Sequence, residues 1–210
     1  MPRGRPRLVP RKGGKPLTST QRRQVKKMID KEVDRGYKDT VADDTDVTWN
    51  NDPVELTAIA EGDSDTTRDG QQIQLTGLNI RINTRPGASQ TVTTTCRLIV
   101  FRWMKDSAPS FNSILDLAGG IDAPASQLNL TTNKGEYQIL HDKSFICAAD
   151  SGSPFYHRAF KHYLKLNGTV TYSGAGSTTG IKGRLYYQFI SDIVSNGPRI
   201  LSSFRLRYNK

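Results

Sequence analysis

Cysteine is scarce in this 210-residue sequence, and long apolar runs are missing from it. The two cysteines, Cys96 and Cys147, cannot form a disulfide framework and do not have the Cys-x-x-Cys spacing of redox and metal motifs. A reducing compartment is therefore expected. No run of about 18 apolar residues occurs, so no membrane span and no membrane partner are expected. The basic start of the chain also lacks the apolar stretch of a secretory signal.

Motifs of catalysis are missing as well. His141, His157 and His162 have neither the His-x-His nor the His-Glu-x-x-His spacing of metal sites, and no Gly-x-Ser-x-Gly motif occurs. The glycine-rich residues 173–180 lack the Lys-Ser/Thr that completes a phosphate-binding loop. His162 alternates with polar residues and is predicted to be a core or interface residue, whereas Cys96 is predicted to be a small core residue. We therefore expect no enzyme activity, no catalytic residue and no cofactor.

A complete cation-binding motif is also missing. Acidic residues gather in the turn-rich residues 39–69, where Asp63-Ser64-Asp65 places two carboxylates at a spacing that suits a hard cation. The remaining positions of a calcium loop are absent, so a solvated loop is the preferred interpretation. A structural calcium ion stays an unsupported alternative, and no metal ligand is predicted.

Acidic residues are absent from the first 29 positions, although the chain has 20 of them. Ten basic residues stand there, and they account for the whole formal net charge of +10, because the other 20 Lys and Arg balance the acids. This asymmetry indicates a neutral body with a basic arm that binds a polyanion; the alternative is a merely solvated terminus. The predicted nucleic-acid-binding residues are Arg3, Arg5, Arg7, Arg11, Lys12, Lys15, Arg22, Arg23, Lys26 and Lys27.

The arm, residues 1–38, has two parts. Residues 1–17 are rich in Pro, Gly, Arg and Lys and are predicted to be disordered when free, because they can bury too little apolar surface. Residues 2–6 look like the Arg-Gly-Arg core of an AT-hook, an element that lies in narrow minor grooves, but a phosphate-neutralising tail or a nuclear-import signal is the preferred interpretation.

The second part of the arm, about residues 20–35, predicts a short amphipathic helix. Such a helix is marginal in water, so we expect it to form against nucleic acid, the body or copies of itself. The N-cap candidates are Thr18, Ser19 and Thr20, and the glycine that could end the helix is Gly36. The apolar stripe consists of Val25, Met28, Ile29 and Val33.

The body, residues 39–210, alternates in the manner of β-strands without a βαβ rhythm. The fold class is therefore predicted to be all-β, an eight-stranded antiparallel sandwich with the jelly roll as the leading architecture. The eight strands are expected at residues 71–82, 91–103, 137–140, 144–147, 159–166, 169–172, 182–190 and 199–208, with a further short strand within 54–59.

Four local features refine this prediction. A phase slip at Gly77 predicts a bulge. The strand that ends at Trp103 becomes apolar on both faces, which is typical of a strand buried between two layers. Residues 111–118 have the apolar spacing of a short helix, and Asn167-Gly168 predicts a hairpin turn.

Seven short segments stand out in their order along the chain. They are QVKKMI at 24–29, DGQQI at 69–73, RLIVFR at 97–102, SILDL at 113–117, YQILHD at 137–142, YLKL at 163–166 and LYYQFISD at 185–192. Together they resemble the single-jelly-roll capsid proteins of satellite tobacco necrosis virus and of circovirus-like viruses with circular single-stranded DNA genomes. The first segment looks like the basic arm helix of the satellite virus, and the next four look like its strands and hairpins. The last two are similar to strands of the DNA viruses.

This resemblance implies a viral capsid (coat) protein, a structural protein of the virion. Its self-assembly would give a small icosahedral T=1 shell of about 60 copies, with the arm inside on a single-stranded genome. The Arg-Gly-Arg-Pro tail departs from the satellite pattern, so DNA is favoured as the packaged nucleic acid and RNA stays possible. For a DNA virus, assembly is expected in the host nucleus. The alternative is a cellular DNA-binding protein with an AT-hook-like tail and a β-sandwich interaction domain.

Overall fold

The computed structural model describes residues 18–32, 35–44, 46–116, 123–129, 135–149, 158–174 and 176–210. The chain divides into two compact units, Met1–Asp34 and Arg35–Lys210. The predicted disordered segment, residues 1–17, lies outside the described residues. No helix among the described residues is long and apolar enough to cross a membrane.

The first unit contains one helix, α1 (Ser19–Glu32), close to the range expected from the sequence. Thr18 and Gln21 begin it with a reciprocal cap: the Thr18 amide donates to Gln21 Oε1 (3.0 Å) and the Gln21 amide donates to Thr18 Oγ1 (3.3 Å). Of the predicted apolar stripe, only the side chain of Val25 is described, and it is 41% exposed. This exposure fits a helix that needs a partner to bury its apolar side.

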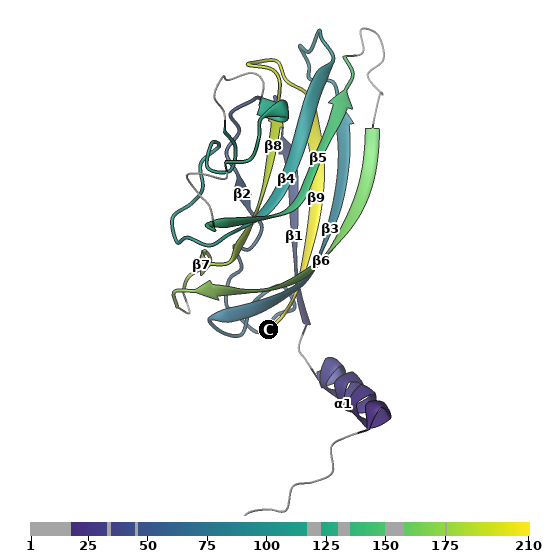
Figure 1. Cartoon of the computed structure of the whole chain (residues 1–210), viewed down its shortest axis with the longest axis vertical. Coiled ribbons are helices and arrows are strands. Elements are labelled where there is room, and N and C mark those ends of the chain that lie inside the picture. Colours follow the sequence, from purple (N-terminus) through teal and green to yellow (C-terminus); the bar gives the residue numbers. More distant parts are fainter. Residues whose placement is uncertain are drawn as a thin grey trace, which may run out of the picture. The chain divides into compact units, whose positions relative to one another are not determined.

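The second unit is a β-sandwich of two antiparallel sheets (Figure 1). Its described residues form nine strands rather than the eight expected. The five-stranded sheet has the order β1 (Arg35–Asp44), β9 (Arg199–Asn209), β3 (Gln72–Arg85), β6 (Arg158–Tyr172) and β7 (Gly180–Lys182). The four-stranded sheet has the order β2 (Val54–Glu55), β8 (Arg184–Ser191), β4 (Thr94–Trp103) and β5 (Tyr137–Cys147).

The strand pairs are nested along the chain. The first strand pairs with the last, β1 with β9, and then β2 pairs with β8, β3 with β6 and β4 with β5. The short β7 is an addition at the edge beside β6. This pairing corresponds to one long antiparallel hairpin whose successive segments are distributed between two sheets.

The core lies between the sheets and follows the predicted alternation. Inward side chains of β3 and β4, such as Ile80 and Leu98, are fully buried, and the rings of Tyr187 and Phe204 stack across the gap at 4.3 Å. The bulge at Gly77 is confirmed, because the pairing of β3 with both neighbours shifts register between Leu75 and Gly77.

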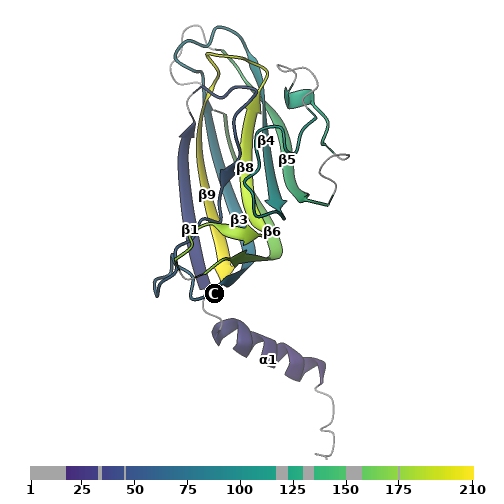
Figure 2. The ribbon, with the colours of Figure 1, turned by 90° about the vertical axis from the view of Figure 1, so that its left-hand side faces the viewer.

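The prediction that the strand ending at Trp103 is buried on both faces is also confirmed. Its outward residues Phe101 and Trp103 join a second apolar cluster with Ile114 and Leu115, which come from the connection between β4 and β5. The 3₁₀ turn η1 (Ala123–Ala125) of the same connection contacts β8 and β4 and lies away from the five-stranded sheet (Figure 2).

Strand β1 was not predicted from the sequence. Residues 39–69 were expected to be turn-rich, and the body was expected to begin at residue 39, but β1 begins at Arg35 and pairs with β9 along all ten of its residues. Its inward positions include Gly36, Lys38 and Ala42, so it shows no apolar alternation. Gly36, which was expected to end the helix, lies in β1, whereas α1 ends at Glu32. A Cβ at Gly36 would lie 2.3 Å from the ring of Tyr208, so this residue makes room for a core tyrosine.

Two segments predicted as hairpins or paired strands are continuous. Residues 137–140 and 144–147 belong to the single strand β5, and Asn167-Gly168 lies inside β6, where Gly168 pairs with Leu75. The hairpin prediction is wrong because Gly168 serves a close approach instead of a turn: a Cβ on it would overlap the guanidinium of Arg102.

The helix predicted over residues 111–118 is also absent from the part of it that the structure describes. Residues 111–116 form turns, and Leu115 makes an isolated bridge to Leu128. Ile114 and Leu115 pack on the outer side of the four-stranded sheet, where both are buried. The segment is therefore apolar because it covers the sheet and not because it forms a helix.

Candidate nucleic-acid interface

Helix α1 carries four of the ten predicted binding residues. Arg22 and Arg23 are exposed, and Lys26 and Lys27 belong to the same helix, although their side chains lie outside the description. Positions four apart on a helix are neighbours, so Arg22 lies beside Lys26 and Arg23 beside Lys27. No acidic residue stands in the first turn of α1, so the helix carries the excess of positive charge that attracts a polyanion.

The other six predicted residues lie outside the described residues. They are Arg3, Arg5, Arg7, Arg11, Lys12 and Lys15. Their role as nucleic-acid contacts stays a prediction from charge alone.

The body separates its charges, although it is neutral as a whole. Acidic residues are frequent in the segment from Asp43 to Asp69, whereas β3, β6 and β9 place basic residues on the outer face of the five-stranded sheet. This second basic surface was not predicted from the sequence, because a balanced total charge hides where the charges lie. Arg205 and Arg207 are two positions apart and Lys161 and Lys165 are four apart, and such even spacing puts each pair on one face of its strand, which is the sequence signal that could have revealed the surface.

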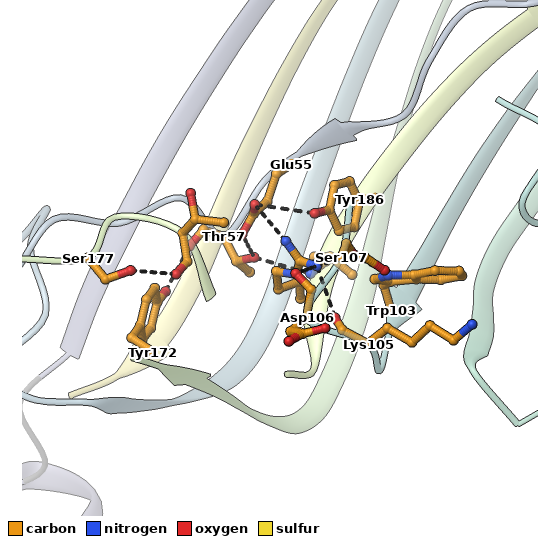
Figure 3. A network of polar contacts seen from close by, with 12 residues as sticks. Glu55, Thr57, Trp103, Lys105, Asp106, Ser107, Tyr172, Ser177 and Tyr186 are labelled. Carbon is orange, nitrogen blue, oxygen red and sulfur yellow. Dashed lines mark hydrogen bonds and ion pairs between the residues drawn. The ribbon is translucent and has the colours of Figure 1, made fainter. Parts of the chain in front are cut away.

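A network around the buried Arg184 is structural. The Arg184 guanidinium donates through Nη2 to the carbonyl oxygens of Lys105 (2.9 Å) and Asp106 (2.6 Å). Figure 3 shows Glu55 between Thr57 and Tyr186, which donate hydrogen bonds to its two carboxylate oxygens. These hydrogen bonds join the segment after β4 to β8 and β2, and the groups that form them are paired within the network.

Two of the three histidines meet at one edge of the sandwich. The rings of His141 on β5 and His162 on β6 stack with centroids 4.6 Å apart, whereas His157 lies outside the described residues. His162 is exposed, so it is not a core residue, and its predicted role as an interface residue stays a prediction. The pair connects the two sheets where consecutive strands pass from one to the other.

This pair predicts that acid weakens the sandwich. Burial, His162 and Lys143 lower the pKa of His141 below 6.5, against an opposing effect of Asp142. Below pH 6.5 the unfolded chain therefore binds this proton more readily than the folded chain, and the free energy of unfolding decreases as the pH falls. We expect His141→Phe, which keeps the stacking but cannot titrate, to lose less stability than the parent between pH 7 and 5. The difference should be at most about 1 kcal/mol at this half-exposed site. Equal slopes of melting temperature against pH in the two proteins would contradict the prediction.

The two cysteines lie side by side in the core. Cys96 on β4 and Cys147 on β5 are both buried and unbridged, with their sulfur atoms 3.4 Å apart. The hydrogen bond with Cys147 and burial raise the pKa of the Cys96 thiol, which disfavours the thiolate that a nucleophile needs. The prediction that Cys96 is a core residue is confirmed.

No group of three or more His, Cys, Asp or Glu side chains suited to a metal ion occurs in the described part of the chain. The Asp63-Ser64-Asp65 turn is exposed and closed by its own hydrogen bonds, in which the Ser64 amide donates to Thr67 Oγ1 (2.8 Å).

No protein-family model matches the sequence, and no curated protein matches it. The features that bear on function are therefore the strand topology and the distribution of charge.

Proposed function

We propose that this chain is a viral capsid protein whose jelly-roll body self-assembles into a small icosahedral shell. In this proposal its basic arm packages a single-stranded genome, with DNA favoured and RNA possible. The observation that carries the proposal is the nested pairing of β1 with β9, β2 with β8, β3 with β6 and β4 with β5.

The nested pairing supports a jelly roll in particular among β-sandwiches. Eight strands that pair first with last, second with second-last and so on form two packed four-stranded sheets of Greek-key connection, the double-sheet architecture of many viral capsid and lectin domains. Here β7 is an extra edge strand outside that set of eight. A lectin would share the fold, so the charge of the arm has to decide between the two functions.

The arm charge supports the capsid function. A closed shell of about 60 identical copies would gather about 600 arm charges, which neutralise about 600 phosphates by displacing counterions. Mobile counterions can neutralise the rest, so a genome of about one to two thousand nucleotides suits such a shell. In this proposal the protein belongs to the virion, and for a DNA virus it is also found in the host nucleus during assembly.

Electron microscopy of the expressed full-length chain tests the proposal. We expect uniform closed particles, and nuclease-treated particles should release single-stranded nucleic acid. A particle mass near that of 60 copies would support the T=1 shell. A protein that stays monomeric and prefers A·T-rich duplexes over single strands would contradict the proposal and favour the AT-hook-like DNA-binding protein.

A further inference from the structure

The outer face of the five-stranded sheet gathers basic residues from three neighbouring strands. Arg81 on β3 lies opposite Ser203 on β9 and Lys161 on β6. One further row, centred on Gly77 of β3, is completed by Arg207 on β9 and Lys165 on β6. Neighbouring strands lie about 4.8 Å apart, so these cations come from a compact area of one sheet. We call Arg81, Lys161, Lys165 and Arg207, which are all exposed, the cationic face.

Acidic residues do not neutralise the cationic face. Asp39 on β1 is bound by Arg205, whose Nε and Nη2 lie 2.7 and 2.6 Å from its carboxylate oxygens, and Asp43 is bound in the same way by Arg199. The hydrogen bonds from Arg205 lower the pKa of Asp39, so its charge is used within that pair. Within the described part of the chain, the four residues of the cationic face have no ion pair.

An aromatic ring lies among these cations. Tyr163 on β6 is 52% exposed, and a Cβ at Gly77 would come within 2.5 Å of its hydroxyl oxygen. The tyrosine therefore lies over the glycine that pairs with both Arg207 and Lys165. Because position 77 has no side chain, the ring can lie across the sheet instead of standing away from it.

A polar groove includes Asn79, the residue of β3 that pairs with Tyr163. It has a volume of about 220 Å³ and is lined by Asn79, Arg81, Ser203, Arg205 and Arg207 together with the already paired Asp39. A water molecule takes about 30 Å³ of liquid, so the groove has room for a phosphate group and its hydration. Hydroxyl, amide and guanidinium groups in its walls are the donors that phosphate oxygens accept from.

We propose that the cationic face and Tyr163 form a second binding surface for single-stranded nucleic acid, on the folded body and separate from the arm. Backbone phosphates would bind the four cations, and a base would stack on Tyr163. Proteins that bind single strands without reading sequence combine the same two elements, a basic groove and exposed aromatic rings. The inference rests on the proposed function and adds to it that the body, as well as the arm, holds the genome.

A matched pair of double variants of the full-length chain tests the charge. Lys161→Gln with Lys165→Gln removes two lysines from the cationic face, and Lys105→Gln with Lys143→Gln removes two lysines from the β4 and β5 side of the sandwich. Binding of a fluorescent deoxythymidine oligonucleotide is measured against salt concentration. Each lost phosphate contact on a single strand reduces the slope of log K against log salt by about 0.7, so the face variant should lose about 1.4 and the control nothing.

Substitutions of Tyr163 test the stacking independently of charge. Tyr163→Leu should weaken binding of the same oligonucleotide about tenfold, whereas Tyr163→Phe, which keeps the ring, should bind like the parent. Melting curves of all four variants establish that they are folded before binding is compared. Equal binding by the leucine and phenylalanine variants would overturn the stacking role.

The outcomes separate this inference from the proposed function. If the face variant and the control variant have the same salt slope, the face is not a nucleic-acid site, whether or not particles form. If the face variant binds the oligonucleotide normally but no longer assembles, the face is a contact between subunits and the inference is overturned. If no variant ever forms particles but the face variant alone loses slope, the binding surface stands and the capsid function fails.

Discussion

Replacing Arg68 with methionine is expected to lower the free energy of unfolding by about 3–5 kcal/mol. Arg68 is fully buried, and its guanidinium binds the carboxylate of Glu61 at 2.8 Å. The same group donates to the carbonyl oxygens of Gly174 and Ser177, both at 2.8 Å, and to that of Gly70. Methionine fills much of the same volume but leaves these acceptors without their donor.

The contacts of Arg68 join two segments that are distant in the chain. Its Nε also donates to the carbonyl oxygen of Ile59 at 3.3 Å, and its guanidinium lies 4.2 Å from the ring centroid of Tyr172. One side chain therefore fixes the connection before β3 to the connection after β6. Loss of the contacts should loosen both at once, because neither has a strand ladder of its own at this point.

A control variant separates the ion pair from the carbonyl contacts. Glu61 is 31% exposed, so Glu61→Gln should cost only about 1 kcal/mol. Urea denaturation of the full-length protein gives both values. If the two variants lose equal stability, the ion pair and not the group of carbonyls carries the effect, and the expected ranking is wrong.

Local patterns predicted those strands whose residues alternate in polarity or are apolar on both faces. The alternation in β3 and β9 and the double-sided apolar pattern of β4 are properties of the sequence alone, and so is the phase slip at Gly77. The β1 strand was missed because it buries glycine, lysine and alanine, which carry no strand signal. It is held by pairing with β9, whose partner residues are more than 150 positions away in the chain.

Close approaches between distant segments were equally invisible. Gly168 was interpreted as a turn glycine because Asn-Gly favours hairpins, and only the position of Arg102 in the other sheet explains it. No pattern in residues 39–69 marked Arg68 as buried, because the carbonyl oxygens that it binds include that of Gly174, more than 100 positions away. Each of these roles depends on a partner that the local sequence does not specify.

The two basic surfaces differ in the same respect. The arm was predictable because its charges are consecutive in sequence and no acid stands among them. The cationic face exists only through the register of β9 with β3 and of β3 with β6, which places Arg207, Gly77 and Lys165 in one row. A count of charges over the body returns zero and cannot reveal it.

Neutralising helix α1 is expected to reduce single-strand binding by almost three orders of magnitude at about 0.1 M salt. The variant replaces Arg22, Arg23, Lys26 and Lys27 with glutamine. Four phosphate contacts contribute about 2.8 to the slope of log K against log salt. Relative to about 1 M salt, where log salt is zero, this slope amounts to about 2.8 decades of affinity at about 0.1 M. Particles of this variant should also contain less nucleic acid than those of the parent.

Glutamine isolates charge from structure, because its helix propensity is close to that of lysine and arginine. Circular dichroism should therefore show the same helix content in the variant and the parent, and the Lys105→Gln, Lys143→Gln protein serves as the control for a general loss of charge. An unchanged salt slope in the helix variant would mean that α1 does not contact nucleic acid. Its apolar positions Val25, Met28 and Ile29 would then assign α1 to packing between copies of the chain, and the arm would bind the genome through residues 1–17 alone.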